Sequence, residues 1–302
     1  MTMTDHDHLA RELFVRSTLL GLGGEAAARL AAALIPLPAR AGDVLFEPGQ
    51  RPERLFMVIE GELALELPGA EPWIFGPRSI VGIIDVMVDR PHVRRCVVRS
   101  DARLLVARAN VWLDLIEDDG VLTRGAVKNT ARSLHELWLE LAAKLPEPLL
   151  AYVNLPPAPL PLYEKILILR DATLLRNAGM QATASLALVA EELRVESGQV
   201  LFEQGGEKDT LYVVGAGTVE LVHEARGVVS SYGPGSLLGG AAALAGELGA
   251  YSAHAIEPST LLRIRDEDFF DQAEEHPDLG RAALSYLMLE REPLLLLRPP
   301  LR

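Results

Sequence analysis

The chain alternates between helical patterns and short apolar stretches that end at glycine. Residues 25–34 and 181–189 are rich in Ala and Leu, which favour helix. The apolar stretches are three to six residues long and rich in branched or aromatic side chains, as strands are. They cover residues 44–46, 55–59, 62–67, 211–214 and 218–222. Short, closely spaced strands after a helix predict a mainly β fold with flanking helices, an antiparallel sandwich or barrel.

The sequence contains two copies of one unit. Residues 42–49 read GDVLFEPG and residues 198–205 read GQVLFEQG, an offset of 156 residues. Further blocks recur in the same order at offsets of 156 and 157 residues, among them the one that ends at Gly61 and recurs up to Gly217. Both glycines are expected in hairpin turns with positive φ. A period of this length is too great for a solenoid and predicts two domains.

A proline-rich segment separates the two copies. Residues 145–163 contain six prolines, which disfavour helix and central strand and favour an extended connector. We therefore expect a first domain at 1–144, a linker at 145–163 and a second domain at 164–302.

A helix with an apolar seam is expected to close the first domain at residues 121–144. The seam residues lie at alternating spacings of four and three, as in a coiled coil. They are Val127, Ala131, Leu134, Trp138 and Leu141. The seam could pair two chains into a homodimer, lie on its own barrel or lie on the second domain, and we take dimerisation as the leading alternative.

The corresponding second helix, residues 279–291, is expected to stop short of Pro293. Beyond it, residues 294–297 are four leucines, an exposed apolar patch unless they dock on another surface. Docking within the same protein is the favoured alternative.

Composition and charge narrow the functional classes. The net charge of −13 argues against general affinity for nucleic acids or anionic membranes. No apolar run is long enough to span a bilayer, and the first eight residues do not resemble a secretory signal, so we expect a cytoplasmic protein without membrane insertion. The lone Cys96 can form neither an internal disulfide nor a cysteine-based zinc site, and is expected to be a buried apolar residue.

Catalytic chemistry finds no support in the sequence. There is no Gly-x-Ser-x-Gly elbow, no Walker loop and no Cys/His nucleophile arrangement. The seven histidines do not form the ligand clusters that a cupin-type metal enzyme needs. We expect no enzyme, no metal and no cofactor.

The order of these blocks resembles the cyclic nucleotide-binding domain family, which includes the catabolite activator protein and the kinase A regulatory subunits. The resemblance covers about 9–144 and 165–292 and implies two tandem jelly-roll barrels of the double-stranded β-helix type. It also implies a phosphate-binding cassette in each, where a glycine opens a short helix, an arginine pairs with the cyclic phosphate and a glutamate binds the ribose. Only 14 residues follow Met288, too few for the family's helix-turn-helix, so we expect no direct DNA binding.

Both cassettes depart from the family pattern. Gly82 and Gly239 match the glycine. The glutamate position holds Ile83 and Gly240, and the arginine position holds His92 and Gly249. Loss of a charge-assisted bond to a buried phosphate costs roughly 1.5–3 kcal/mol, so ordinary tight binding of cAMP is not expected in either copy. The second cassette also offers no cation in the sequence around it, and we expect it to be degenerate and without ligand.

The first cassette has basic residues near the missing arginine. In a strand after Pro91, His92 and Arg94 would share a face, and either could replace it. The candidate ligand-binding residues are Gly82, Ile83, Ile84, His92, Arg94 and Arg95. The alternative interpretation is a solvated basic edge strand that prevents edge pairing.

Two functions remain open. The preferred one is a non-catalytic regulatory or scaffolding protein built from two degenerate cyclic nucleotide-binding-like domains, which acts through contacts with a protein partner. The alternative is a sensor that binds a cyclic nucleotide or another small anion at the first cassette and signals through helix 121–144.

Overall fold

The computed structural model describes residues 24–141, 159–225 and 227–297. They form two compact units. The first unit comprises the chain up to Ala126 together with the chain from Met288, and the second unit comprises Val127–Leu287. This grouping differs from a division at the proline-rich segment, because most of the closing helix groups with the second unit and the end of the last helix with the first. Residues 145–158 of the predicted linker lie outside the described residues.

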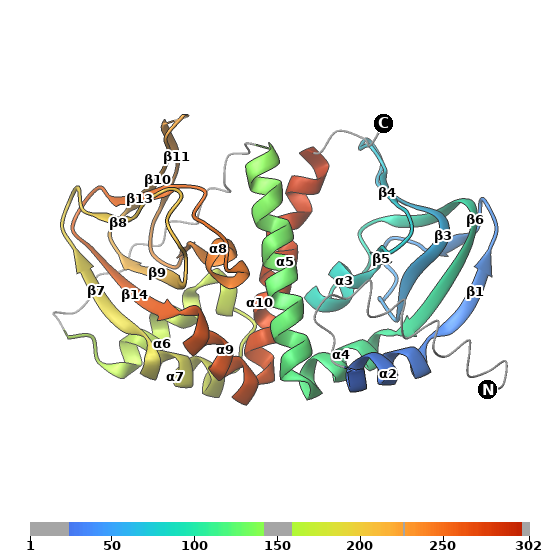
Figure 1. The fold of residues 1–302 in the computed structure, drawn as a ribbon, viewed down its shortest axis with the longest axis horizontal. Helices are drawn as coiled ribbons and strands as arrows, with labels where there is room; N and C mark the ends of the chain where they lie inside the picture. The colour runs from blue at the N-terminus through green and yellow to red at the C-terminus, as the bar shows by residue number, and fades with distance from the viewer. Residues whose placement is uncertain (1–23, 142–158, 226, 298–302) are drawn as a thin grey trace. The chain divides into compact units, whose positions relative to one another are not determined.

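The first unit is built on a six-stranded antiparallel sheet (Figure 1). Strand β6 pairs with β1, β2 and β3, and β3 also pairs with β4 and β5. Helices α2 and α4 contact each other and both contact β6. The elements are α2 Gly24–Ala33, β1 Ile35–Ala39, β2 Val44–Phe46, β3 Arg54–Glu66, β4 Trp73–Phe75, β5 Ile80–Val81, α3 Ile83–Val88, β6 Arg95–Arg108, α4 Ala109–Asp118 and the start of α5 Gly120–Leu141.

Strand β3 replaces two strands expected from the sequence. Gly61 has a positive φ of 85°, but it lies inside β3 and not in a hairpin turn, so that prediction was wrong. The pairing register with β6 shifts between Val58 and Leu63, which marks β-bulges. A Cβ at Gly61 would lie 2.6 Å from the carbonyl oxygen of Asp101, so only glycine lets the two strands approach here. Gly217 does lie between β9 and β10, with a φ of 82°.

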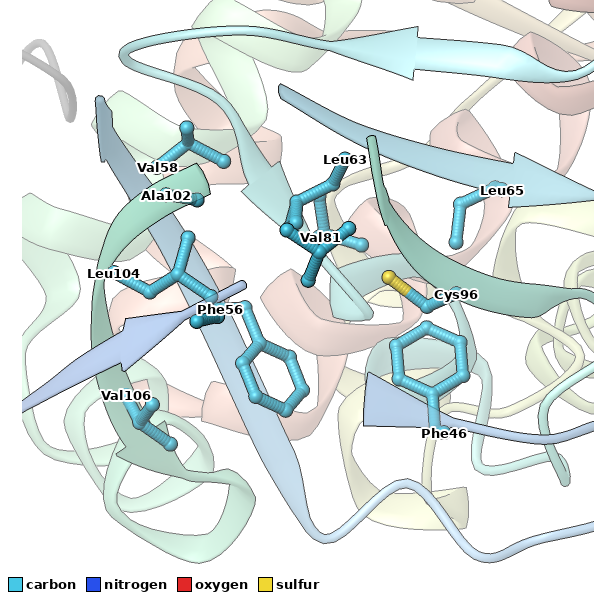
Figure 2. Packing of buried hydrophobic residues seen from close by; sticks show 12 residues of the cluster. Phe46, Phe56, Val58, Leu63, Leu65, Val81, Cys96, Ala102, Leu104 and Val106 are labelled. Atoms are coloured by element: carbon cyan, nitrogen blue, oxygen red, sulfur yellow. The ribbon is translucent and has the colours of Figure 1, made fainter. Parts of the chain in front are cut away.

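The core of the first unit lies within this curved sheet (Figure 2). Phe46, Phe56, Leu63 and Cys96 come from three strands, β2, β3 and β6, and are each less than a tenth exposed. Cys96 is free and buried, as predicted, and burial raises the pKa of its thiol to about 12. The alternation of buried and exposed positions along β6 follows from one face of the strand lining this core.

The second unit contains two four-stranded antiparallel sheets, in the orders β11-β10-β13-β8 and β12-β9-β14-β7. Their shared apolar cluster includes Val214, Leu221, Tyr251 and Leu261. Helix α7 contacts α6 and α9 (Figure 1). The elements are α6 Leu162–Asp171, η1 Thr173–Leu175, α7 Met180–Val189, β7 Glu191–Val195, β8 Val200–Phe202, β9 Thr210–Ala216, β10 Val219–His223, β11 Gly227–Tyr232, β12 Leu237–Leu238, α8 Gly240–Ala245, β13 Ser252–Ala255, β14 Ser259–Arg265, α9 Asp266–Glu275 and α10 Pro277–Leu297.

The predicted seam is the buried face of α5. Val127, Ala131 and Leu134 are at most 1% exposed. Trp138 packs against the apolar cluster of the second unit, and the side chain of Leu141 lies outside the described residues. Because this chain itself covers these side chains, the structure favours the alternatives in which the seam packs within the chain, and dimerisation through it stays a prediction.

Helix α10 continues through Pro293, so the predicted end at residue 291 was wrong. A proline removes the hydrogen bond to the carbonyl four residues earlier, here that of Leu289. Leu289 is 40% exposed and Pro293 is exposed, so water can satisfy that carbonyl. Leu294 is only 4% exposed, so the first of the four tail leucines is docked and not free. No described helix combines the length and apolar character required to cross a bilayer.

Candidate ligand site in the first unit

The first cassette, residues 82–95, begins at a glycine that the backbone requires. Gly82 lies before α3 with a φ of 92°, and a Cβ there would lie 3.1 Å from the carbonyl oxygen of Arg54. Gly239 takes the same place before α8, with a φ of 73° and Thr210 as its neighbour. The glycine match predicted from the sequence therefore has the same physical cause in both units. Ile83 and Ile84 form the first turn of α3 and are half-buried.

His92 is buried in the first cassette and engaged by its own unit. It is 4% exposed, and its ring stacks on Phe46 with 3.7 Å between the centroids. Its Nδ1 lies 2.9 Å from the Oδ2 of Asp85. Its backbone N–H donates to Gln50, and its carbonyl accepts from Gly49. His92 therefore takes the arginine position as a packed ring held by a carboxylate.

Arg90 links two carboxylates at the edge of the cassette. Its Nε donates to Asp85 over 2.8 Å, and its Nη2 donates to Glu292 over 2.7 Å. The side chains of Asp85 and Glu292 are 13% and 18% exposed. Asp85 thus holds both His92 and Arg90, which fixes α3 to the loop that follows it.

Arg94 is the buried cation of the cassette. It is 5% exposed, and its Cζ lies 3.8 Å from the centroid of the Trp73 ring. Its Nε and Nη1 and the Nε1 of Trp73 are buried, and none has a hydrogen-bond partner among the residues that the structure describes. Burial lowers the pKa of the Arg94 guanidinium, and the charges of Glu292 and Asp85 oppose that shift only in part. An anion bound beside these three buried donor nitrogens would provide the hydrogen-bond acceptors that they lack.

Arg95 does not join this group. Its side chain is 45% exposed and contacts Glu47 and Glu66 on the outer face of the sheet. His92 and Arg94 are both buried, but they precede β6, so the strand expected for them was wrong. Arg95 and Arg99 are exposed on β6, which pairs with β2 on one side and β3 on the other and is therefore not an edge strand.

Two residues at this site escaped the sequence reasoning. Trp73 comes from β4, which reaches the cassette through its pairing with β3. Glu292 lies 202 residues after Arg90. Neither belongs to a local motif, so only the fold could bring them to the cassette.

The second cassette, residues 239–250, contains a cation after all. A Cβ at Gly249 would lie 2.6 Å from the Cε of Lys208, so the missing side chain at the arginine position makes room for this lysine. The Nζ of Lys208 lies 3.7 Å from the ring centroid of Phe202 and donates to the carbonyl of Glu203 over 3.5 Å. Lys208 is 8% exposed, and burial lowers its pKa. The expectation that no cation lies near this cassette was wrong, because Lys208 is 41 residues earlier in the sequence.

Two features of the second cassette are unfavourable for an anionic ligand: its close packing and the acidic residues beside it. A Cβ at Gly240 would meet Leu237 at 2.5 Å, and all six residues of α8 are buried. A cleft of about 530 Å³ beside Lys208 is lined mainly by carboxylates. Those residues are Glu207, Asp209, Glu247, Asp266 and Glu267. Their charge makes the cleft unfavourable for an anion.

Comparison with known proteins places both units in one family. The cyclic nucleotide-binding domain model matches residues 36–119 and 192–276, more than half of the chain. The chain belongs to the cyclic nucleotide-binding domain family. Each matched range lies within one of the two units and includes its cassette.

Two curated relatives are much longer than this chain and match it only over part of their length. The lysophospholipase NTE1 of Chaetomium globosum is 29% identical over 118 residues, which are 38% of this chain and 8% of that protein. The lysophospholipase nte1 of Neosartorya fischeri is 27% identical over 278 residues, which are 85% of this chain and 17% of that protein. The chain therefore spans less than a fifth of either relative.

Among solved structures, the regulatory domain of Toxoplasma gondii PKA with cAMP is similar to this chain. It is 16% identical, covers 92% of this chain and 96% of its own, and has a TM-score of 0.36.

Proposed function

We propose that this protein is a regulatory protein whose first cyclic nucleotide-binding domain binds a small monoanion, a cyclic nucleotide or an anion of similar size, at Arg94. The observation that carries the proposal is the buried guanidinium of Arg94, whose Nε and Nη1 have no acceptor among the described residues. An unpaired buried donor costs about 1–3 kcal/mol, and a phosphate or carboxylate oxygen would remove that cost.

The charges around the cassette favour a monoanion. Arg90 and Arg94 contribute two positive charges, and Asp85 and Glu292 contribute two negative ones. The four side chains are therefore neutral as a group, while the hydrogen-bonding capacity of Arg94 is unused. A ligand with one negative charge is attracted by the Arg94 guanidinium and is repelled less by the carboxylates of Asp85 and Glu292 than a ligand with several negative charges.

The second domain supports a different role in this proposal. Its cation lies on an aromatic ring beside an acidic cleft, so we assign it no anion ligand and expect it to act through protein contacts. Helix α5 connects the two roles along the chain, since it begins at Gly120 in the first unit and packs Trp138 on the core of the second. We assign the protein no catalytic activity and a cytoplasmic location as parts of the same proposal.

Thermal unfolding with and without ligand tests this function. The full chain is heated with millimolar cAMP, cGMP or inorganic phosphate, alongside the Arg94→Met and Arg95→Met variants. A ligand at 100 times its dissociation constant adds about 2.7 kcal/mol, which raises the melting temperature by several degrees. The shift should disappear in Arg94→Met and persist in Arg95→Met, the matched control with an exposed guanidinium. No shift with any probe, or an equal shift in Arg94→Met, would contradict the proposal.

A second candidate function is ligand-independent scaffolding. It is favoured by His92, whose ring packs on Phe46 and whose Nδ1 is held by Asp85, so the arginine position itself offers no free donor at that nitrogen. On this candidate, binding of a protein partner is unchanged by any nucleotide and by Arg94→Met. The same thermal experiment separates the two functions.

A further inference from the structure

The end of α10 docks on the first cassette through an ion pair. Glu292 accepts a hydrogen bond of 2.7 Å from Arg90, and their side chains are 18% and 27% exposed. Both residues belong to the first unit, which takes up α10 from Met288 onward. Leu294, half a turn further along the helix, is 4% exposed. A charged and an apolar side chain therefore anchor the last turns of this helix together.

Glu292 also acts on the cation to which we assign the ligand. The negative charge of its carboxylate is the strongest of those that favour the protonated state of Arg94, ahead of Asp85. No described residue accepts a hydrogen bond from the Nε or Nη1 of Arg94, so Glu292 compensates its charge without meeting its donors. The carboxylate thus supplies part of what a bound anion would supply.

We propose that Glu292 is a tethered anion of the first cassette, and that binding of an external monoanion and docking of the end of α10 oppose each other. This inference rests on the proposed function. An incoming anion adds a third negative charge beside Asp85 and Glu292, and one of the carboxylates must become less favourable there. Binding would thereby loosen the end of α10 and convert occupancy of the cassette into a change in helix docking.

Glu292 is the carboxylate that yields. Asp85 lies on α3 within the cassette and is held by two partners, His92 Nδ1 and Arg90 Nε. Glu292 lies five residues before the end of α10 at Leu297, and among the described residues Arg90 is its one hydrogen-bond partner. A helix end can leave a surface without disturbing the sheet, because its own hydrogen bonds run within the helix.

Two measurements on the full chain test the inference. Calorimetric titration with cAMP and with inorganic phosphate compares the wild type, Glu292→Gln and Glu62→Gln. Glu62 is an exposed carboxylate on β3 and controls for the loss of one negative charge. We expect Glu292→Gln to bind about tenfold more tightly, a typical coupling between two sites, and Glu62→Gln to bind like the wild type. Unchanged or weaker binding by Glu292→Gln would overturn the inference while leaving the proposed function intact.

Amide hydrogen exchange of residues 288–297 measures the docking of the helix end directly. Without ligand, exchange should be faster in Arg90→Met than in the wild type. In the wild type, exchange should become faster when the ligand is bound. Equal exchange in Arg90→Met and the wild type would show that the ion pair does not hold the helix end, and would overturn the inference. If neither probe binds any variant, the proposed function fails, and the Arg90→Met comparison alone still decides whether Glu292 anchors α10.

Discussion

Replacing Arg94 by methionine should make the ligand-free protein more stable. Methionine keeps most of the side-chain volume and removes the buried donors Nε and Nη1, each of which costs about 1–3 kcal/mol when unpaired. The change also removes the contact with the Trp73 ring, a cation–π interaction worth up to ~2 kcal/mol when desolvated. The pKa of Arg94 is lowered, so burial outweighs the attraction of Glu292 and Asp85 for its charge. We expect a net gain of about 1–2 kcal/mol in the free energy of unfolding.

The same substitution should have the opposite effect once ligand is present. At 100 times the dissociation constant, the wild type gains about 2.7 kcal/mol and the variant gains none. The order of stability then reverses, and the wild type becomes more stable by about 0.7–1.7 kcal/mol. This reversal distinguishes a residue kept for binding from one kept for folding, since a structural arginine would stabilise the protein with or without ligand.

Urea denaturation measures both halves of this prediction. Two of the three tryptophans, Trp73 and Trp112, lie in the first unit and Trp138 lies in the second, so tryptophan fluorescence reports mainly on the unfolding of the first unit. Arg95→Met is the control and should stay within about 0.5 kcal/mol of the wild type, because its guanidinium is exposed. A loss of more than about 1 kcal/mol in ligand-free Arg94→Met would refute the reasoning, because it would mean that the guanidinium already has its partners in the free protein.

Three further predictions concern Glu290, the contact of Gly249 with Lys208, and Cys96. Burial raises the pKa of Glu290 to about 7, so the folded state keeps a proton that the unfolded state loses near pH 4.5, and the free energy of unfolding falls as the pH rises from about 4.5 to 7. In urea unfolding, the stability of Glu290→Gln relative to the wild type should therefore increase by about 2–3 kcal/mol between pH 5 and 8. A difference that stays constant with pH would contradict this prediction. Gly249→Ala should cost about 1–2 kcal/mol by displacing Lys208, and the double variant with Lys208→Ala should recover most of that loss; additive effects of the two changes would argue against the contact. Cys96, with a thiol pKa of about 12, should react with a disulfide reagent at pH 8 at least a hundredfold more slowly in the native protein than in urea, and equal rates would show that its strand opens.

Local patterns predicted the elements that depend on local chemistry. The repeated glycine-bounded blocks identified two mainly β domains, and the helices at 24–33 and 180–189 begin within one residue of their predicted starts. The continuous strand through Gly61 was missed because a positive φ serves a turn and a β-bulge equally well. Similarly, Pro293 appeared to end a helix, yet a proline on the solvent face leaves only one carbonyl for water to satisfy.

The candidate site could be predicted only in part, for a different reason. His92 and Arg94 are two residues apart, so an extended backbone can turn both to one side, and both are buried although β6 begins only at Arg95. Their partners depend on long-range pairing: Trp73 arrives through β4, and Glu292 through the far end of α10. Sequence alone therefore found the nitrogen-bearing side chains of the first cassette but not the ring beneath Arg94 or the carboxylate that balances its charge.

The two cassettes together show that the absence of arginine from its position in the motif does not mean that the cassette contains no buried cation. Phe46 and Phe202 occupy corresponding positions of the repeat, and each carries a nitrogen-containing group on its face at 3.7 Å. In the first unit this group is His92, from the arginine position itself. In the second it is Lys208, which enters because Gly249 at that position has no side chain.

The repeated phenylalanine thus has a nitrogen-containing group on its ring face in both units, although a different position of the sequence supplies that group. An aromatic face attracts cations, and the space left by one side chain in a packed barrel is filled by another. The two units then differ in their buried cation, which is Arg94 over Trp73 in the first and Lys208 over Phe202 in the second. Arg94 retains buried donors without acceptors, whereas Lys208 faces a carbonyl and an acidic cleft. Ligand binding should therefore follow the unpaired donors of the first unit and not the residue found at the motif position.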